Sequence, residues 1–146
     1  GRGEVIEPLP DPAPVTFTPF VSDIETEDKT RRMYSVLTPA DHTDGRRTHV
    51  AAETLRRALP LTDVDYLNAF DRHIGEVAPP MAAAMAVCRD AALVVHAAGS
   101  GPGFFTITPL SELPDLLLRE LEREWDVRAI ACSSLGREAA LAMNEV

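Results

Sequence analysis

Residues 91–108 read Ala91-Ala92-Leu93-Val94-Val95-His96-Ala97-Ala98, then Gly99-Ser100-Gly101-Pro102-Gly103, then Phe104-Phe105-Thr106-Ile107-Thr108. An apolar run enters a glycine-rich turn and a second apolar run leaves it, so the stretch predicts two strands joined by a turn. Glycines at alternate positions allow positive φ angles and close backbone approach. Successive N–H groups can then face one concavity and bind an anion such as phosphate. A hairpin turn that binds nothing is the alternative interpretation.

The glycine turn differs from two motifs that it partly resembles. A Walker A loop requires G-x-x-x-x-G-K-[ST], and the single lysine of the chain, Lys29, lies far away in the sequence. The nucleophile elbow of hydrolases is G-x-S-x-G leading into a helix, whereas this turn leads into a strand. A phosphate at this turn would therefore be bound by backbone dipoles and Ser100, and a hydrolase is excluded.

Outward from the turn, apolar periodicity and breakers predict the other elements. The predicted helices cover residues 27–37, 48–59, 62–77, 81–89 and 111–124, and the predicted strands cover residues 4–9, 15–20, 91–98, 104–108 and 127–133. We expect strand 91–98 to be central in the sheet, and Ser111 to cap its helix with Pro114 in the first turn. Residues 134–146 are expected to fray or to form a short tail helix. This order predicts an α+β sandwich, a mainly antiparallel sheet covered by helices on one face.

Length and charge narrow the class of protein. The 146 residues suit a single domain, 1–146, and 45% of them are hydrophobic. A net charge of −9 argues against nucleic acid or an anionic membrane as the partner. We found no apolar run of membrane-spanning length and no signal-like start, which predicts a cytoplasmic protein. Cys88 and Cys132 are predicted to be buried free thiols.

The histidines predict no metal site. None of the four has a histidine or cysteine neighbour at metal-ligand spacing, so we expect no zinc. We interpret His96 as a hydrogen-bonded histidine within the sheet.

Four stretches, in this order, resemble the C-terminal domain of the 4-diphosphocytidyl-2-C-methyl-D-erythritol kinase family, a branch of the GHMP small-molecule kinases. They are Gly1-Arg2-Gly3-Glu4 with Pro8-Leu9, Lys29-Thr30 with Tyr34, Asn68-Ala69-Phe70-Asp71, and Ala98-Gly99-Ser100-Gly101-Pro102 with Phe104-Phe105. The resemblance implies ATP-dependent phosphorylation of the 2-hydroxyl of a cytidine-diphosphate-linked methylerythritol, in the non-mevalonate isoprenoid route. It also implies a ferredoxin-like fold.

The resemblance assigns roles to individual residues. It implies that Thr30 and Tyr34 bind substrate, and their spacing of one helical turn would place both on one face, the ring stacking on cytosine. It implies that the loop Gly99, Ser100, Gly101, Pro102 and Gly103 shapes the phosphate region. Asn68 matches a position that we assign to helix structure. An early-helix polar residue and a half-buried core aromatic are the alternative interpretations of Thr30 and Tyr34.

The sequence departs from the family pattern at two points, and both bear on substrate binding or catalysis. Residues 22–27 are strongly acidic, which would repel a diphosphate. The N-terminal ATP-binding domain and its catalytic pair do not occur in this chain, so we expect no catalytic residue here. ATP and Mg²⁺ would be bound by the full-length enzyme, and this chain alone would be inactive. A domain separated from its partner would expose an apolar face and self-associate.

Two alternatives stay open at the level of sequence. The first is the C-terminal domain of another GHMP kinase, of the homoserine or mevalonate type. The second is a free-standing, non-catalytic ligand-binding module of ferredoxin-like fold, because such scaffolds carry many unrelated functions. The match of Thr30 and Tyr34 to the family pattern favours the cytidine substrate over the first alternative, and an upstream glycine-rich ATP motif in the same reading frame would favour the kinase over the second.

Overall fold

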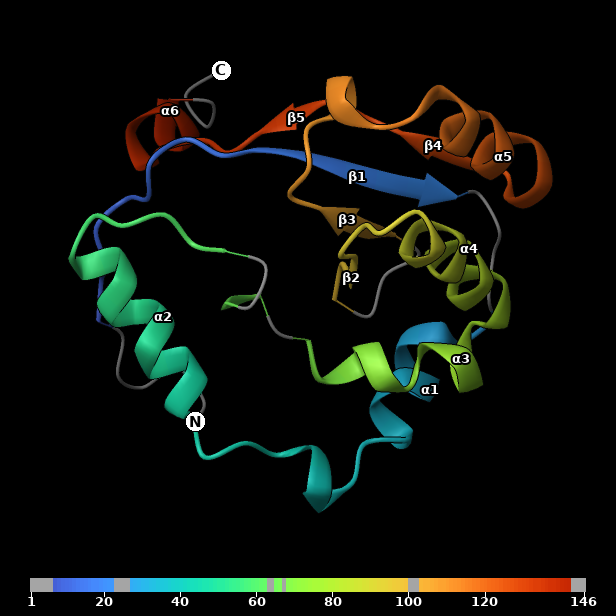
Figure 1. Cartoon of the computed structure of the whole chain (residues 1–146). Coiled ribbons are helices and arrows are strands. Elements are labelled where there is room, and N and C mark those ends of the chain that lie inside the picture. Colours follow the sequence, from blue (N-terminus) through green and yellow to red (C-terminus); the bar gives the residue numbers. More distant parts are fainter. Residues whose placement is uncertain (1–6, 23–26, 63–64, 67, 100–102, 143–146) are drawn as a thin grey trace.

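An antiparallel sheet lies beside a group of helices in the computed structural model (Figure 1), which describes residues 7–22, 27–62, 65–66, 68–99 and 103–142. The strands in these ranges are β1 (Thr16–Ser22), β2 (His96–Ala97), β3 (Phe104–Thr106), β4 (Val127–Ala129) and β5 (Cys132–Ser133). Their order is β2-β3-β1-β4, and β5 pairs with the start of β1. The α+β class and the mainly antiparallel sheet are therefore confirmed.

The strand register sorts side chains onto the two faces of the sheet. Phe20 of β1 pairs with Phe104 of β3, and their rings stack with centroids 4.7 Å apart. Both rings are buried. The neighbouring pair, Pro19 with Phe105, points to the opposite face because side chains alternate along a strand. His96 pairs with Phe105 and shares that opposite face.

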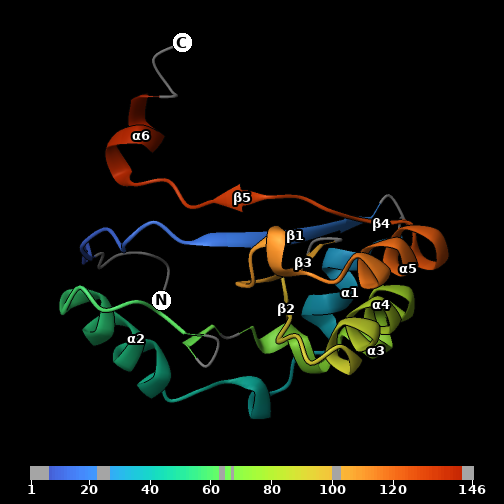
Figure 2. The same cartoon turned by 45° about the horizontal axis from the view of Figure 1, so that its top comes forward.

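Within the described ranges, the helices are α1 (Lys29–Ser35), α2 (Arg46–Arg56), α3 (Ile74–Val77), α4 (Pro79–Asp90), α5 (Asp115–Trp125) and α6 (Arg137–Ala142), with 3₁₀ turns at Pro39–Asp41, Ala69–Arg72 and Leu110–Glu112. Four of these helices, α1, α3, α4 and α5, share the core with Phe20 and Phe104. Figure 2 shows α1, α3, α4 and α5 grouped near one end of the sheet, with α2 standing apart from them. The buried core comprises Phe20, Met33, Phe70, Ile74, Val77, Ala84, Met85, Cys88, Val95, Ala97, Phe104, Leu113, Leu117, Leu121 and Val127.

The hairpin predicted at the glycine turn is present, but its first strand is shorter and lies elsewhere in the sheet. β2 comprises only two residues and is at the sheet edge, whereas we expected a central strand over residues 91–98. The cause is the end of α4, where Ala92 has a φ angle of 61° and the N–H of Leu93 bonds back to the carbonyl of Cys88. The chain therefore completes a helix cap before it becomes extended.

The helix predicted over residues 62–77 is wrong. The described part of that range contains a 3₁₀ turn at Ala69–Arg72 and the short helix α3. The side chain of Asn68 accepts a hydrogen bond from the N–H of Phe70, which starts a new turn at Asn68 and ends any helix that would pass through it.

Three smaller predictions also need correction. Residues 7–9 are not in a strand, and residues 1–6 lie outside the described ranges. Predicted strand 127–133 is divided into β4 and β5, where the N–H of Ile130 bonds to the carbonyl of Pro19. Helix α5 starts after Pro114, and Ser111 belongs to the separate 3₁₀ turn, because Pro114 takes the cap position in extended conformation.

The remaining predicted elements occur near their expected positions. Strand 15–20, helices 27–37, 48–59 and 81–89, and the tail helix correspond to β1, α1, α2, α4 and α6. Both cysteines are free, and Cys88 is buried while Cys132 is only half-buried. Within the described residues, no helix is long and apolar enough to cross a membrane.

Candidate functional site

Thr30 and Tyr34 lie on one exposed face of helix α1. They are separated by four residues, which is about one helical turn, and both are exposed to solvent. Met33 of the same helix is fully buried, so it is the opposite face of α1 that packs into the core. The structure therefore brings the two predicted substrate-binding residues together on an accessible surface.

The ring of Tyr34 is exposed but held in place. It is 61% exposed and contacts the buried ring of Phe70 edge-on, with centroids 5.2 Å apart and an interplanar angle of 81°. In an edge-to-face contact the two rings do not stack, so at least one face of the Tyr34 ring is not covered by Phe70. Tyr34 is thus not the half-buried core aromatic of the alternative interpretation, and it offers a supported flat surface to a ligand.

The start of α1 carries charges of both signs. Lys29 is buried, its Nζ lies 3.3 Å from the sulfur of Met81, and burial lowers the pKa of the ammonium group. Arg31 lies 3.9 Å from the exposed carboxylate of Asp28. A shallow groove here is lined by Glu27, Asp28, Arg31, Arg32 and Ser35. Most of the acidic segment that we noted, residues 23–26, lies outside the described residues.

The glycine loop is described at its two ends, Gly99 and Gly103, and each end has a physical need for glycine. Gly99 has a φ angle of 66°, a conformation that side chains disfavour. A Cβ at Gly103 would lie 3.0 Å from the carbonyl oxygen of Phe20 in β1. The N–H of Ala98 bonds to the carbonyl of Gly103 and closes the hairpin. Ser100, Gly101 and Pro102 lie outside the described residues, and the phosphate role of the loop stays a prediction.

A clamp of two side chains holds the free edge of β2. The amide of Asn68 donates to the carbonyls of Ala97 (2.9 Å) and Gly99 (3.3 Å). The carboxylate of Asp71 accepts the N–H of Ala97 at 2.7 Å and lies 3.3 Å from Nδ1 of His96. The edge strand and the first glycine of the loop are therefore fixed by side chains from a distant segment. Sequence reasoning missed this role of Asn68 and Asp71, although it singled out their segment.

Segment 68–71 connects the two parts of the predicted site. Its Phe70 supports the Tyr34 ring from behind, and its Asn68 and Asp71 hold the strand that enters the glycine loop. Three of the four stretches that carry the family resemblance thus contact one another in the fold. The fourth, near the N-terminus, is described only from residue 7 onwards.

A buried carboxylate, that of Asp41, also anchors the same segment. Asp41 accepts the N–H of Thr38 at 2.7 Å and lies 2.9 Å from Nε2 of His73 and 3.2 Å from Arg72. The Thr38 backbone bond first, and the His73 contact next, hold the pKa of Asp41 well below its usual range. Asp41 thereby ties the turn after α1 to the turn that contains Phe70.

His96 has only half of its expected hydrogen bonds. Nδ1 faces Asp71, but Nε2 is buried without a hydrogen-bond partner among the described residues. Our expectation of a fully hydrogen-bonded histidine therefore needs correction. As to metals, the described residues contain no cluster of three His, Cys, Asp or Glu side chains that could bind an ion.

Comparison with solved structures gives an informative match. No family model and no curated protein matches the chain. Among solved structures, a crystal structure of 4-(cytidine 5′-diphospho)-2C-methyl-D-erythritol kinase is similar, with 26% sequence identity and a TM-score of 0.60. The match covers 93% of this chain and 48% of the crystallised chain, so this chain spans about half the length of that protein. The resemblance seen in the sequence is confirmed, and so is the expected fold.

Proposed function

We propose that this chain, which resembles half of a crystallised kinase, is the substrate-side domain of an ATP-dependent kinase. The proposed reaction is phosphorylation of the 2-hydroxyl of 4-diphosphocytidyl-2-C-methyl-D-erythritol, in non-mevalonate isoprenoid biosynthesis. The observation that carries the proposal is the exposed, supported ring of Tyr34 beside Thr30 on α1. Both free cysteines suit a reducing compartment, and we propose the cytoplasm.

Tyr34 suits the recognition of a pyrimidine. A flat ring that is exposed on one side and supported on the other loses little conformational freedom when a base stacks on it. Such stacking contributes about 1–3 kcal/mol per base. Thr30 adds a hydroxyl that can donate or accept a hydrogen bond at the same face. Tyr34 would thus provide affinity for the cytosine, and Thr30 would orient the substrate.

The charges at the start of α1 act on the diphosphate in opposite directions. The guanidinium groups of Arg31 and Arg32 attract it, and the carboxylates of Glu27 and Asp28 repel it. Asp28 already lies close to Arg31, which partly offsets its charge. Because these side chains are exposed, salt screens both effects. We expect the net electrostatic effect to be small, and stacking on Tyr34 to dominate binding.

The chemical step requires groups that we assign to the other half of the enzyme. Phosphoryl transfer relies on positioning and on charge stabilisation, with Mg²⁺ on the nucleotide phosphates. This chain covers 48% of the crystallised kinase. We propose that ATP and Mg²⁺ bind the other, ATP-binding half, and that this chain orients the substrate. The chain alone should show no ATP-dependent turnover.

Isothermal titration of the chain with 4-diphosphocytidyl-2-C-methyl-D-erythritol, CDP and UDP tests the proposal. We expect saturable binding that is tightest for the full substrate. Tyr34→Ala should weaken it at least tenfold, Tyr34→Phe should retain it, and Val50→Ala, another exposed apolar residue, serves as the control.

The titration has two informative negative outcomes. If the isolated chain does not bind, the same titration is repeated on this chain fused behind the ATP-binding half of the crystallised kinase. Absence of binding there, or binding indifferent to Tyr34→Ala, would refute the assignment. Equal affinity for ligands without cytidine would favour another GHMP kinase or a non-catalytic module.

A further inference from the structure

A second cavity lies on the opposite face of the sheet from Tyr34. It has a volume of about 260 Å³ and is lined by Pro12, Ala13, Val15, Phe17, Pro60, Leu61, Tyr66, Phe105, Ile107 and Ser134. Phe105 shares the face of Pro19 and His96, whereas Tyr34 contacts Phe70 in the core on the other face. The sheet itself therefore separates this cavity from the proposed substrate site.

The wall of the cavity is built from interlocked rings. Tyr66 meets Phe105 edge-on with centroids 5.8 Å apart, and His96 lies behind both, 5.7 Å from Phe105 and 6.1 Å from Tyr66. Asp71 holds the His96 ring through Nδ1. Opposite this wall, the Ser134 hydroxyl accepts the N–H of Val15, which ties the proline-rich segment to the C-terminal part of the chain. The cavity is thus formed before any ligand arrives.

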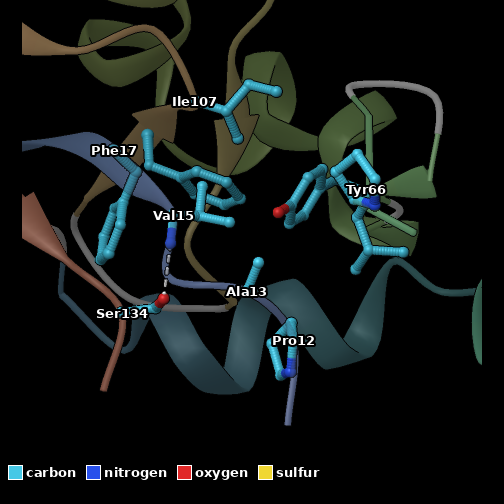
Figure 3. Close-up of a pocket in the computed structure, with 10 residues that line it drawn as sticks. Pro12, Ala13, Val15, Phe17, Tyr66, Ile107 and Ser134 are labelled. Atoms are coloured by element: carbon cyan, nitrogen blue, oxygen red, sulfur yellow. Dashed lines mark hydrogen bonds between the residues drawn. The ribbon is translucent and has the colours of Figure 1, made fainter. Parts of the chain in front are cut away.

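Lining chemistry restricts what can bind. None of the lining side chains carries a charge, so neither a phosphate nor a carboxylate would be compensated there. Figure 3 shows the Tyr66 hydroxyl pointing toward Val15, and Ser134 on the other side of Val15, joined to it by a hydrogen bond. These hydroxyls suit one hydrogen-bonding group on an otherwise apolar molecule.

The volume of the cavity limits the size of the ligand that it can hold. An apolar cavity of about 150 Å³ accommodates benzene, and this one is larger. We propose that the cavity is a binding site for an uncharged small molecule of one or two rings with a single hydrogen-bonding group. Because His96, whose ring contacts the lining residues Tyr66 and Phe105, begins β2, which leads into Gly99, occupancy would be transmitted to the glycine loop. The site is therefore suited to an effector.

Indole is the probe that tests this site, observed by ¹H–¹⁵N NMR of the whole chain. We expect saturable shifts at Val15, Phe17, Phe105 and Ile107, and smaller shifts at Ala97 and Gly99. Ala13→Phe, on the exposed proline-rich segment, fills the cavity and should weaken binding at least tenfold. Ala86→Phe, on the exposed surface of α4, is the matched control and should bind like the wild type.

Each result decides the proposal. If Ala13→Phe loses its native spectrum, Leu61→Trp replaces it as the filling variant. Shifts scattered away from the cavity, no saturation, or unchanged binding in the filling variant would overturn the proposal. Tyr34→Ala should leave indole binding intact, and excess CDP should not compete. Failure of this site is therefore distinguishable from failure of the proposed substrate site.

Discussion

Asp41 is the residue on which acid stability should depend most. Its pKa is lowered in the folded state by the Thr38 N–H and by His73, with Arg72 also close. A lowered folded pKa stabilises the protein above the pKa of the unfolded carboxyl, near 4, and this stability disappears as the pH falls below it. Urea unfolding between pH 7 and pH 3 should therefore show a decline that is shallower in Asp41→Asn. Glu122→Gln, at an exposed helix position, should retain the wild-type slope.

Asp71 is a second single residue with a testable role, because it binds the edge strand β2. Its carboxylate accepts the N–H of Ala97 at 2.7 Å, so Asp71→Ala leaves that donor without its partner. Loss of such a bond costs about 1–3 kcal/mol where the donor stays buried. We expect hydrogen exchange at Ala97 to accelerate at least tenfold, and exchange in α5 to follow only the global change. Unaltered exchange at Ala97 would mean that the clamp does not hold β2. Asp90→Ala, on an exposed helix end, is the control.

Helices α2 and α4 both end in a cap in which an alanine, Ala58 or Ala92, has a positive φ angle. After α4, the N–H groups of Ala92 and Leu93 bond to the carbonyls of Arg89 and Cys88, and Ala92 has a φ angle of 61°. This is a Schellman cap in which glycine is favoured. Ala92→Gly should raise the free energy of unfolding by about 0.5–1 kcal/mol, since relief of left-handed strain exceeds the entropy cost of glycine.

The control for Ala92→Gly is a second alanine-to-glycine substitution in α4. Ala86→Gly, in the interior of α4, should lower the free energy of unfolding by about 1 kcal/mol. Opposite signs at two alanines of one helix, measured by urea unfolding, would identify the cap conformation as the cause. A loss at both positions would contradict it.

For the whole molecule, we predict self-association. Large hydrophobic side chains are exposed at Tyr34, Val50, Leu59, Val94, Leu116, Ile130, Leu135 and Leu141. Leu116 of α5 is 81% exposed, and an interface normally covered by another domain has this character. Sedimentation velocity from micromolar to near-millimolar concentration should show a rising mean mass, which Leu116→Glu should reduce. A constant monomer mass would contradict the prediction.

Sequence reasoning identified local features well and distant contacts poorly. The glycine turn predicted the β2–β3 hairpin, and the spacing of Thr30 and Tyr34 predicted one helix face. The clamp was not predictable, because Asn68 and Ala97 are 29 residues apart and no periodicity links them. Helix 62–77 failed because local side-chain hydrogen bonding at Asn68 competes with the helix. Competing local chemistry and long-range pairing thus account for the errors.

The central place of β1 has a consequence for how the protein is made. β1 ends at residue 22, yet its partners β3, β4 and β5 lie at residues 104–106, 127–129 and 132–133. A ribosome that has released β1 must reach residue 104 before the first of these strands can pair with it. Loop closure over such separations is slow. The apolar face of β1 therefore stays without its strand partners, and open to aggregation, until residues 104–133 have been made.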